Sequence, residues 1–262
     1  MSDKIKFKVS FFQNLYFHIE KLSGIIEQRY NDKYNNAFSN KIKNIEEFNY
    51  IFDPQVISWP IKEALVECKN VDDLKKYVYK GLKELSDEIS SVLFNNISYY
   101  KKEWDNTLYK KLMMQKKKLE KDLKSELNVL VDKISDITNI SWKKLPINIY
   151  LIDCISEEYG LGGEPLFDGI CIGFTGDKNL MKAVIVHELI HLNLKRELKS
   201  VIPSKFKDKE DIINEALTSV YSNKILGENK PNFKDERKYF ADMFWKGYKG
   251  KYDVKNIIKL IR

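Results

Sequence analysis

The chain has 262 residues, 43% of them hydrophobic and 32% charged, which is typical of a folded globular protein and excludes a disordered one. No apolar run approaches the roughly 20 residues of a membrane-spanning helix, and the N-terminus lacks the apolar stretch of a signal peptide. We therefore expect a cytoplasmic protein with no membrane partner. The net charge of +7 comes mainly from lysines interleaved with acidic residues, which indicates a solvated surface and argues against a nucleic-acid partner. Cys68, Cys154 and Cys171 have no C-x-x-C spacing, so we expect them to be reduced and partly buried.

Residues 1–140 carry apolar side chains at helical spacing almost throughout. The pattern predicts helices at about 11–30, 71–93 and 98–137. The third has its apolar stripe on one side, which indicates packing on a partner helix. No motif in this region carries chemistry. We interpret it as a helical region that could cover a site elsewhere in the chain.

The character of the sequence changes after residue 140. Residues 145–152 read as a strand entered through a proline, and residues 169–174 read as a second strand that is apolar on both faces. A glycine-rich turn at 160–163 separates them. Helices are predicted at about 179–199, at 208–226 with an end at Gly227, after Pro231, and at 257–261. The sequence therefore predicts an α+β protein that is predominantly helical, with a small β-sheet in a second domain, residues 141–262.

The motif that carries chemistry is His187-Glu188-Leu189-Ile190-His191, in the first of these C-terminal helices. Residues four apart lie on one face of a helix, so both imidazoles can bind one metal ion. Glu188 lies about 100° away around the helix axis, where it would flank the ion without binding it. This arrangement is typical of a zinc site with a neighbouring general base.

A catalytic zinc ion needs a third protein ligand. Glu215, on the following helix, lies among apolar residues, where a metal ion would offset the cost of burying its carboxylate. Two alternatives remain open. Glu197 lies six residues after His191, where another metalloprotease class has its third histidine, and His18 is the one histidine outside the motif.

The motif, the segment Asn214-Glu215-Ala216-Leu217 and the strand at 169–174 together resemble the gluzincins, the thermolysin-like zincin metallopeptidases. Ala216 departs from the glycine that is usual in this family. The resemblance covers about residues 145–226 and implies a zincin-like catalytic domain in which Glu215 completes the zinc site. It also implies that the strand is an edge strand that pairs with the substrate backbone. The substrate-binding residues would then be Gly169, Ile170, Cys171, Ile172 and Gly173.

We therefore expect a zinc-dependent metallopeptidase that acts on a peptide or protein, with Zn²⁺ as its cofactor and Glu188 as general base. Similar enzymes also have a tyrosine or histidine that stabilises the oxyanion. We favour Tyr248, which lies between glycines, over Tyr221, Tyr239 and Tyr252. Two alternatives are a catalytically silent zincin-like binding module and a helical interaction protein with lysine-rich faces.

Overall fold

The computed structural model describes residues 3–22, 100–153, 163–165, 169–247, 256 and 258–261. Several sequence predictions lie outside these residues: the helix at 71–93, the turn at 160–162, Cys68, Cys154, Tyr248 and Tyr252. The described part of the chain is mostly helical with one small sheet, which confirms the predicted α+β class. None of its helices is long and apolar enough to cross a membrane.

The sheet has four strands in the order β1-β2-β4-β3. Three of them are parallel: β1 (Ile5–Lys8), β2 (Ile147–Ile152) and β4 (Gly169–Gly173). The short β3 (Gly163–Pro165) runs antiparallel to β4 and lies against a helix. All residues of β2 and β4 are buried, which explains why both strands read as continuous apolar runs in the sequence.

The strand β1 was not predicted, and it corrects the reading of the first 140 residues as almost entirely helical. Ile5 and Phe7 are buried while Lys6 is exposed, so the segment alternates as a strand should. Four residues are too few for this alternation to identify a strand without its partner. Because β1 pairs with β2, the sheet crosses the predicted domain boundary at residue 140.

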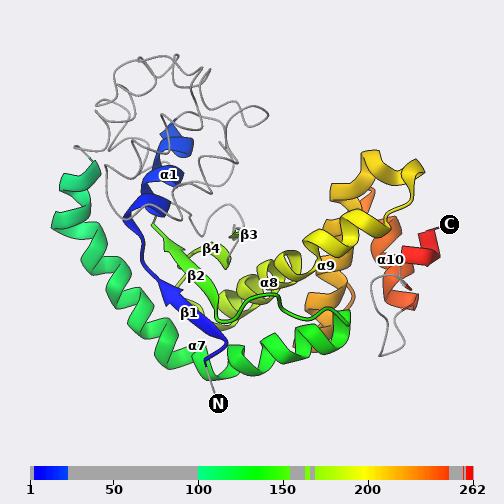
Figure 1. Ribbon diagram of the computed structural model, residues 1–262, viewed down its shortest axis with the longest axis horizontal. Helices are drawn as coiled ribbons and strands as arrows, with labels where there is room; N and C mark the ends of the chain where they lie inside the picture. The colour runs from blue at the N-terminus through cyan, green and yellow to red at the C-terminus, as the bar shows by residue number, and fades with distance from the viewer. Residues whose placement is uncertain are drawn as a thin grey trace.

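Two helices from the first 140 residues pack on this sheet. In α1 (Phe11–Leu22), the buried Asn14 donates from Nδ2 to the carbonyl oxygen of Leu151 at 2.8 Å and accepts from the backbone N–H of Asp153. A π-helical turn (Trp104–Leu108) leads into α7 (Tyr109–Thr138), a long curved helix that passes along the sheet (Figure 1). The predicted apolar stripe of α7 is buried and contacts β1 and the helix that follows the sheet.

The remaining helices follow the sheet in the sequence and extend away from it in space (Figure 1). They are α8 (Lys178–Val201), a 3-10 segment (Ser204–Lys209), α9 (Glu210–Leu226), α10 (Arg237–Gly247) and a short turn (Lys259–Ile261). Asp177 caps α8 by accepting from the backbone N–H of Leu180 at 2.8 Å. Gly227 ends α9 in the left-handed conformation, as the sequence predicts.

Candidate metal centre

The helix α8 presents both histidines of the motif to the neighbouring α9. Leu189 and Ile190, which lie between them in the sequence, are fully buried and hold the opposite side of the helix in the core. The Nε2 atoms of His187 and His191 are 3.0 Å apart, and their ring centroids are 4.6 Å apart. The predicted pairing of the two imidazoles is therefore confirmed.

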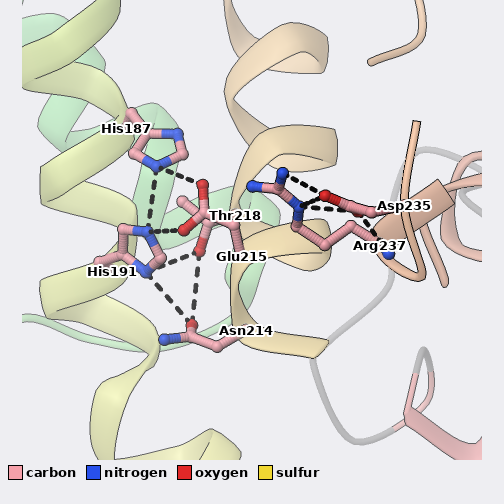
Figure 2. Close-up of polar contacts among 7 residues, drawn as sticks. All are labelled: His187, His191, Asn214, Glu215, Thr218, Asp235 and Arg237. Carbon is pink, nitrogen blue, oxygen red and sulfur yellow. Dashed lines mark hydrogen bonds and ion pairs between the residues drawn. The ribbon is translucent and has the colours of Figure 1, made fainter. Parts of the chain in front are cut away.

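Glu215, on α9, is brought opposite the two histidines (Figure 2). One carboxylate oxygen lies 3.3 Å from Nε2 of His187, and the other lies 3.1 Å from Nε2 of His191. We call His187, His191 and Glu215 the His-His-Glu cluster. Among the described residues it is the one group of three His, Cys, Asp or Glu side chains close enough together to hold a metal ion.

The two alternatives to Glu215 are not part of this cluster. His18 is buried, and its ring packs against Tyr100 with the centroids 4.5 Å apart. Glu197 lies on α8 but does not join the cluster. Of the three candidates for a third ligand, the structure brings only Glu215 to the two histidines.

The geometry of the cluster fits a tetrahedral zinc ion. Zinc binds imidazole nitrogen and carboxylate oxygen at about 2.0–2.2 Å, which places neighbouring ligand atoms of a tetrahedron roughly 3.3–3.6 Å apart. The two Nε2 atoms are 3.0 Å apart, and each lies 3.1 or 3.3 Å from a different carboxylate oxygen of Glu215, so small movements would bring one oxygen and both nitrogens to that spacing. Three ligands would leave one coordination position for water.

Two side chains on α9 hold the far side of the His191 ring. Its Nδ1 atom lies 3.3 Å from Oδ1 of Asn214 and 3.1 Å from Oγ1 of Thr218 (Figure 2). Because the amide oxygen of Asn214 can only accept, Nδ1 carries a hydrogen, so Nε2 is the atom with which the neutral ring would bind a metal ion. Sequence reasoning missed Thr218, although its spacing of four residues from Asn214 places both on one face of the helix.

The charges of the cluster are coupled in the absence of a metal ion. Burial favours the neutral form of Glu215, but hydrogen bonds from His187 and His191 outweigh it and hold the pKa of the carboxyl far below its usual range. For His191, burial acts to lower the pKa, and the hydrogen bond to Glu215 and the charge of Glu188 more than offset that effect, so the pKa is raised. A cationic group is therefore stabilised at this position.

Glu188 lies on the same helix as the two histidines and is not part of the His-His-Glu cluster. Its side chain is largely buried, and its charge acts on His191. Of the tyrosines considered as oxyanion donors, Tyr221 is fully buried in the core, whereas Tyr239 is 67% exposed on α10. The favoured Tyr248 lies outside the described residues.

The expected edge strand at 169–174 is wrong in one respect. Strand β4 pairs with β2 on one side and with β3 on the other, so Ile170, Cys171 and Ile172 have no free edge for a substrate. The edge next to α8 belongs to β3, which is too short to be recognised from the sequence. Gly169 has a packing role instead, because a Cβ atom there would lie 1.9 Å from the carbonyl oxygen of Asn148 on β2.

An arginine that the sequence did not single out lies next to the cluster. Arg237, the first residue of α10, forms hydrogen bonds and an ion pair with Asp235. Its guanidinium group lies beside α9 and extends toward Glu215 in Figure 2. The ion pair with Asp235 raises the pKa of Arg237, and the charge of Glu215 adds to this effect.

Comparison of the chain with protein families, with curated proteins and with solved structures found no match. The likeness to the gluzincins therefore depends on the motif residues and their arrangement alone.

Proposed function

We propose that the protein is a zinc-dependent metallopeptidase with a zincin-like catalytic domain. The observation that carries the proposal is the convergence of His187, His191 and Glu215 from two helices, close enough together to hold one metal ion. The position of Glu188 on the same helix as the two histidines adds a general base. A purely structural zinc site would have four protein ligands, whereas the described residues supply three.

In this mechanism each residue has a separate task. His187, His191 and Glu215 hold the ion, and Thr218 and Asn214 keep the His191 ring in its binding tautomer. When bound, zinc supplies Lewis acidity, which polarises a carbonyl group and lowers the pKa of a water toward about 7. Glu188 accepts a proton from the attacking water and delivers it to the amine that leaves as the peptide bond breaks.

The test combines metal analysis with two matched variants on α8. We expect the purified protein to bind one zinc ion per chain and to cleave members of a peptide library, with cleavage abolished by a chelator and restored by zinc. Glu188→Gln should keep the zinc ion and lower the cleavage rate by about 100- to 10,000-fold, because the general base is lost. Glu197→Gln removes a carboxylate from the same helix outside the cluster and should change neither property.

Two outcomes would contradict the proposal. A zinc content well below one ion per chain would contradict the proposed metal site. Undiminished cleavage by Glu188→Gln would contradict the role of Glu188 as general base. Full zinc occupancy without cleavage of any library peptide would instead favour a catalytically silent binding module.

A further inference from the structure

We propose that Arg237 forms a subsite for a substrate carboxylate next to the His-His-Glu cluster. The inference depends on the proposed function, since it assigns a specificity-determining residue to the same site. Three observations support it. Asp235 and Phe233 hold the guanidinium group in place, one edge of the group stays open, and α10 places that edge toward the cluster.

Arg237 is held on one edge and one face. Its Nε donates to both carboxylate oxygens of Asp235 at 2.9 Å, and its Nη2 donates to one of them. The backbone N–H of Arg237 also donates to Asp235 at 2.9 Å, so the carboxylate is itself fixed at the start of α10. Phe233 lies under the guanidinium plane, with its ring centroid 4.7 Å from the central carbon. Together these contacts preorganise the group.

The contacts leave the other edge of the guanidinium group open. Asp235 uses the edge formed by Nε and Nη2, so the edge formed by Nη1 and Nη2 keeps its N–H donors. Among the described residues Nη1 has no hydrogen-bond or ion-pair partner, and Figure 2 shows it on the side of the group that faces His187 and Glu215. The side chain is 39% exposed, so a ligand can reach it.

The chemistry of that edge selects a planar anion. A guanidinium edge with parallel N–H groups matches a carboxylate in a bidentate arrangement, which a neutral amide cannot reproduce. Glu215 cannot fill this role while it binds both histidines. A peptide bound at the cluster can supply a carboxylate in two ways, from its C-terminus or from an acidic side chain.

The experiment uses the zinc-loaded full chain and peptides made in matched forms. Each peptide sequence is prepared with a free or an amidated C-terminus, and with glutamate or glutamine at an internal position. We expect kcat/KM to favour one carboxylate form over its amide by about 10- to 100-fold, the usual effect of a charged hydrogen-bonded pair. Arg237→Gln should abolish that preference, and Arg237→Lys should restore part of it.

Lys238→Gln is the matched control, because it removes the same charge from the neighbouring residue, whose ammonium group pairs with Asp242 at 2.8 Å. This variant should keep the preference for the carboxylate. A preference that survives in Arg237→Gln, or the absence of any preference in the wild-type protein, would overturn the subsite.

A second measurement separates this inference from the proposed activity. In zinc-loaded Glu188→Gln protein, carboxylate peptides should shift the side-chain ¹⁵N–H signals of Arg237, and the amide forms should not. A carboxylate-specific shift without cleavage by the wild-type protein would support the subsite while the peptidase proposal fails. Cleavage without any such shift would refute the subsite alone.

Discussion

The residues in and around the cluster differ in how readily they can be predicted from the sequence. His187, Glu188 and His191 are separated by a few positions of one helix, so their spacing alone predicts a shared face. Glu215 was found because a carboxylate among apolar residues needs a partner. Arg237 and Thr218 were missed. Thr218 contacts His191 on another helix, which the sequence does not show, and Arg237 pairs with the nearby Asp235, but its position beside α9 follows only from the fold.

Thr218 is expected to affect the metal without binding it. Thr218→Val keeps the shape of this fully buried side chain but removes the hydroxyl that lies 3.1 Å from Nδ1 of His191. We expect zinc affinity to fall by about 10- to 100-fold, because the orientation of the ring is then less well fixed. Competition titration against a chelator measures this change.

Ser222→Ala is the control for that substitution. Ser222 lies one turn further along α9, is buried, and has an Oγ atom with no hydrogen-bond partner among the described residues. Its loss should leave zinc affinity within a factor of about two. Equal affinities for Thr218→Val and the wild-type protein would show that the hydroxyl does not position His191.

The raised pKa of His191 predicts that protons compete with zinc at a higher pH than they would for a histidine of ordinary pKa. Zinc binds the neutral ring, so binding must displace a proton that the metal-free protein retains above the usual histidine pKa of about 6.5. The pKa of Glu215 is depressed, so this carboxylate stays ionised and releases no proton. Apparent zinc affinity should therefore fall as the pH decreases, by up to about tenfold per unit for each proton displaced.

Calorimetric zinc titrations in buffers with different ionisation enthalpies measure the number of protons released. We expect proton release at neutral pH, and less of it as the pH rises through the raised pKa of His191. An affinity that is constant from about pH 6 to about pH 8 would show that His191 is already neutral in the metal-free protein.

At the scale of elements, the long helices could be predicted and the short strands could not. The sequence placed α8, α9 and β2 close to their observed bounds, because long periodic runs and buried apolar strands carry a strong local signal. Strands β1 and β3 have four and three residues and gain their structure from neighbours that are distant in the chain. The order of the sheet, and with it the identity of its edge, follows from that non-local pairing.

Gly169 provides a test of how β2 and β4 are held together. Its Cα lies opposite Asn148 in the parallel ladder, where a Cβ atom would collide with the backbone. Gly169→Ala should therefore lower the free energy of unfolding by about 1–3 kcal/mol, as overpacking does in other cores. Denaturation with urea measures this change.

Gly227→Asn is the matched control, because a side chain at Gly227 has open space and asparagine tolerates the left-handed backbone. It should change stability by less than about 0.5 kcal/mol. If Gly169→Ala were no more destabilising than this control, the close approach of the two strands would not be required for folding.

At the scale of the whole molecule, the described residues share one core. Buried side chains from β1, α1 and α7 belong to the same cluster as those from β2, α8 and α9. Buried polar contacts join the two sides as well: Thr138 on α7 donates to Asn193 on α8 at 2.7 Å. The domain boundary predicted at residue 140 therefore does not separate two hydrophobic cores among the described residues.

The pairing of Ile5 with Ile147 has a consequence for the order of events during synthesis. The first strand leaves the ribosome long before its neighbour in the sheet exists, so Ile5 and Phe7 must remain unpaired while more than half of the chain is made. Contacts between such distant segments form late and slow the folding of a domain. The helices that carry the histidines and Glu215 follow β2 in the chain, so they are synthesised after both of these paired strands.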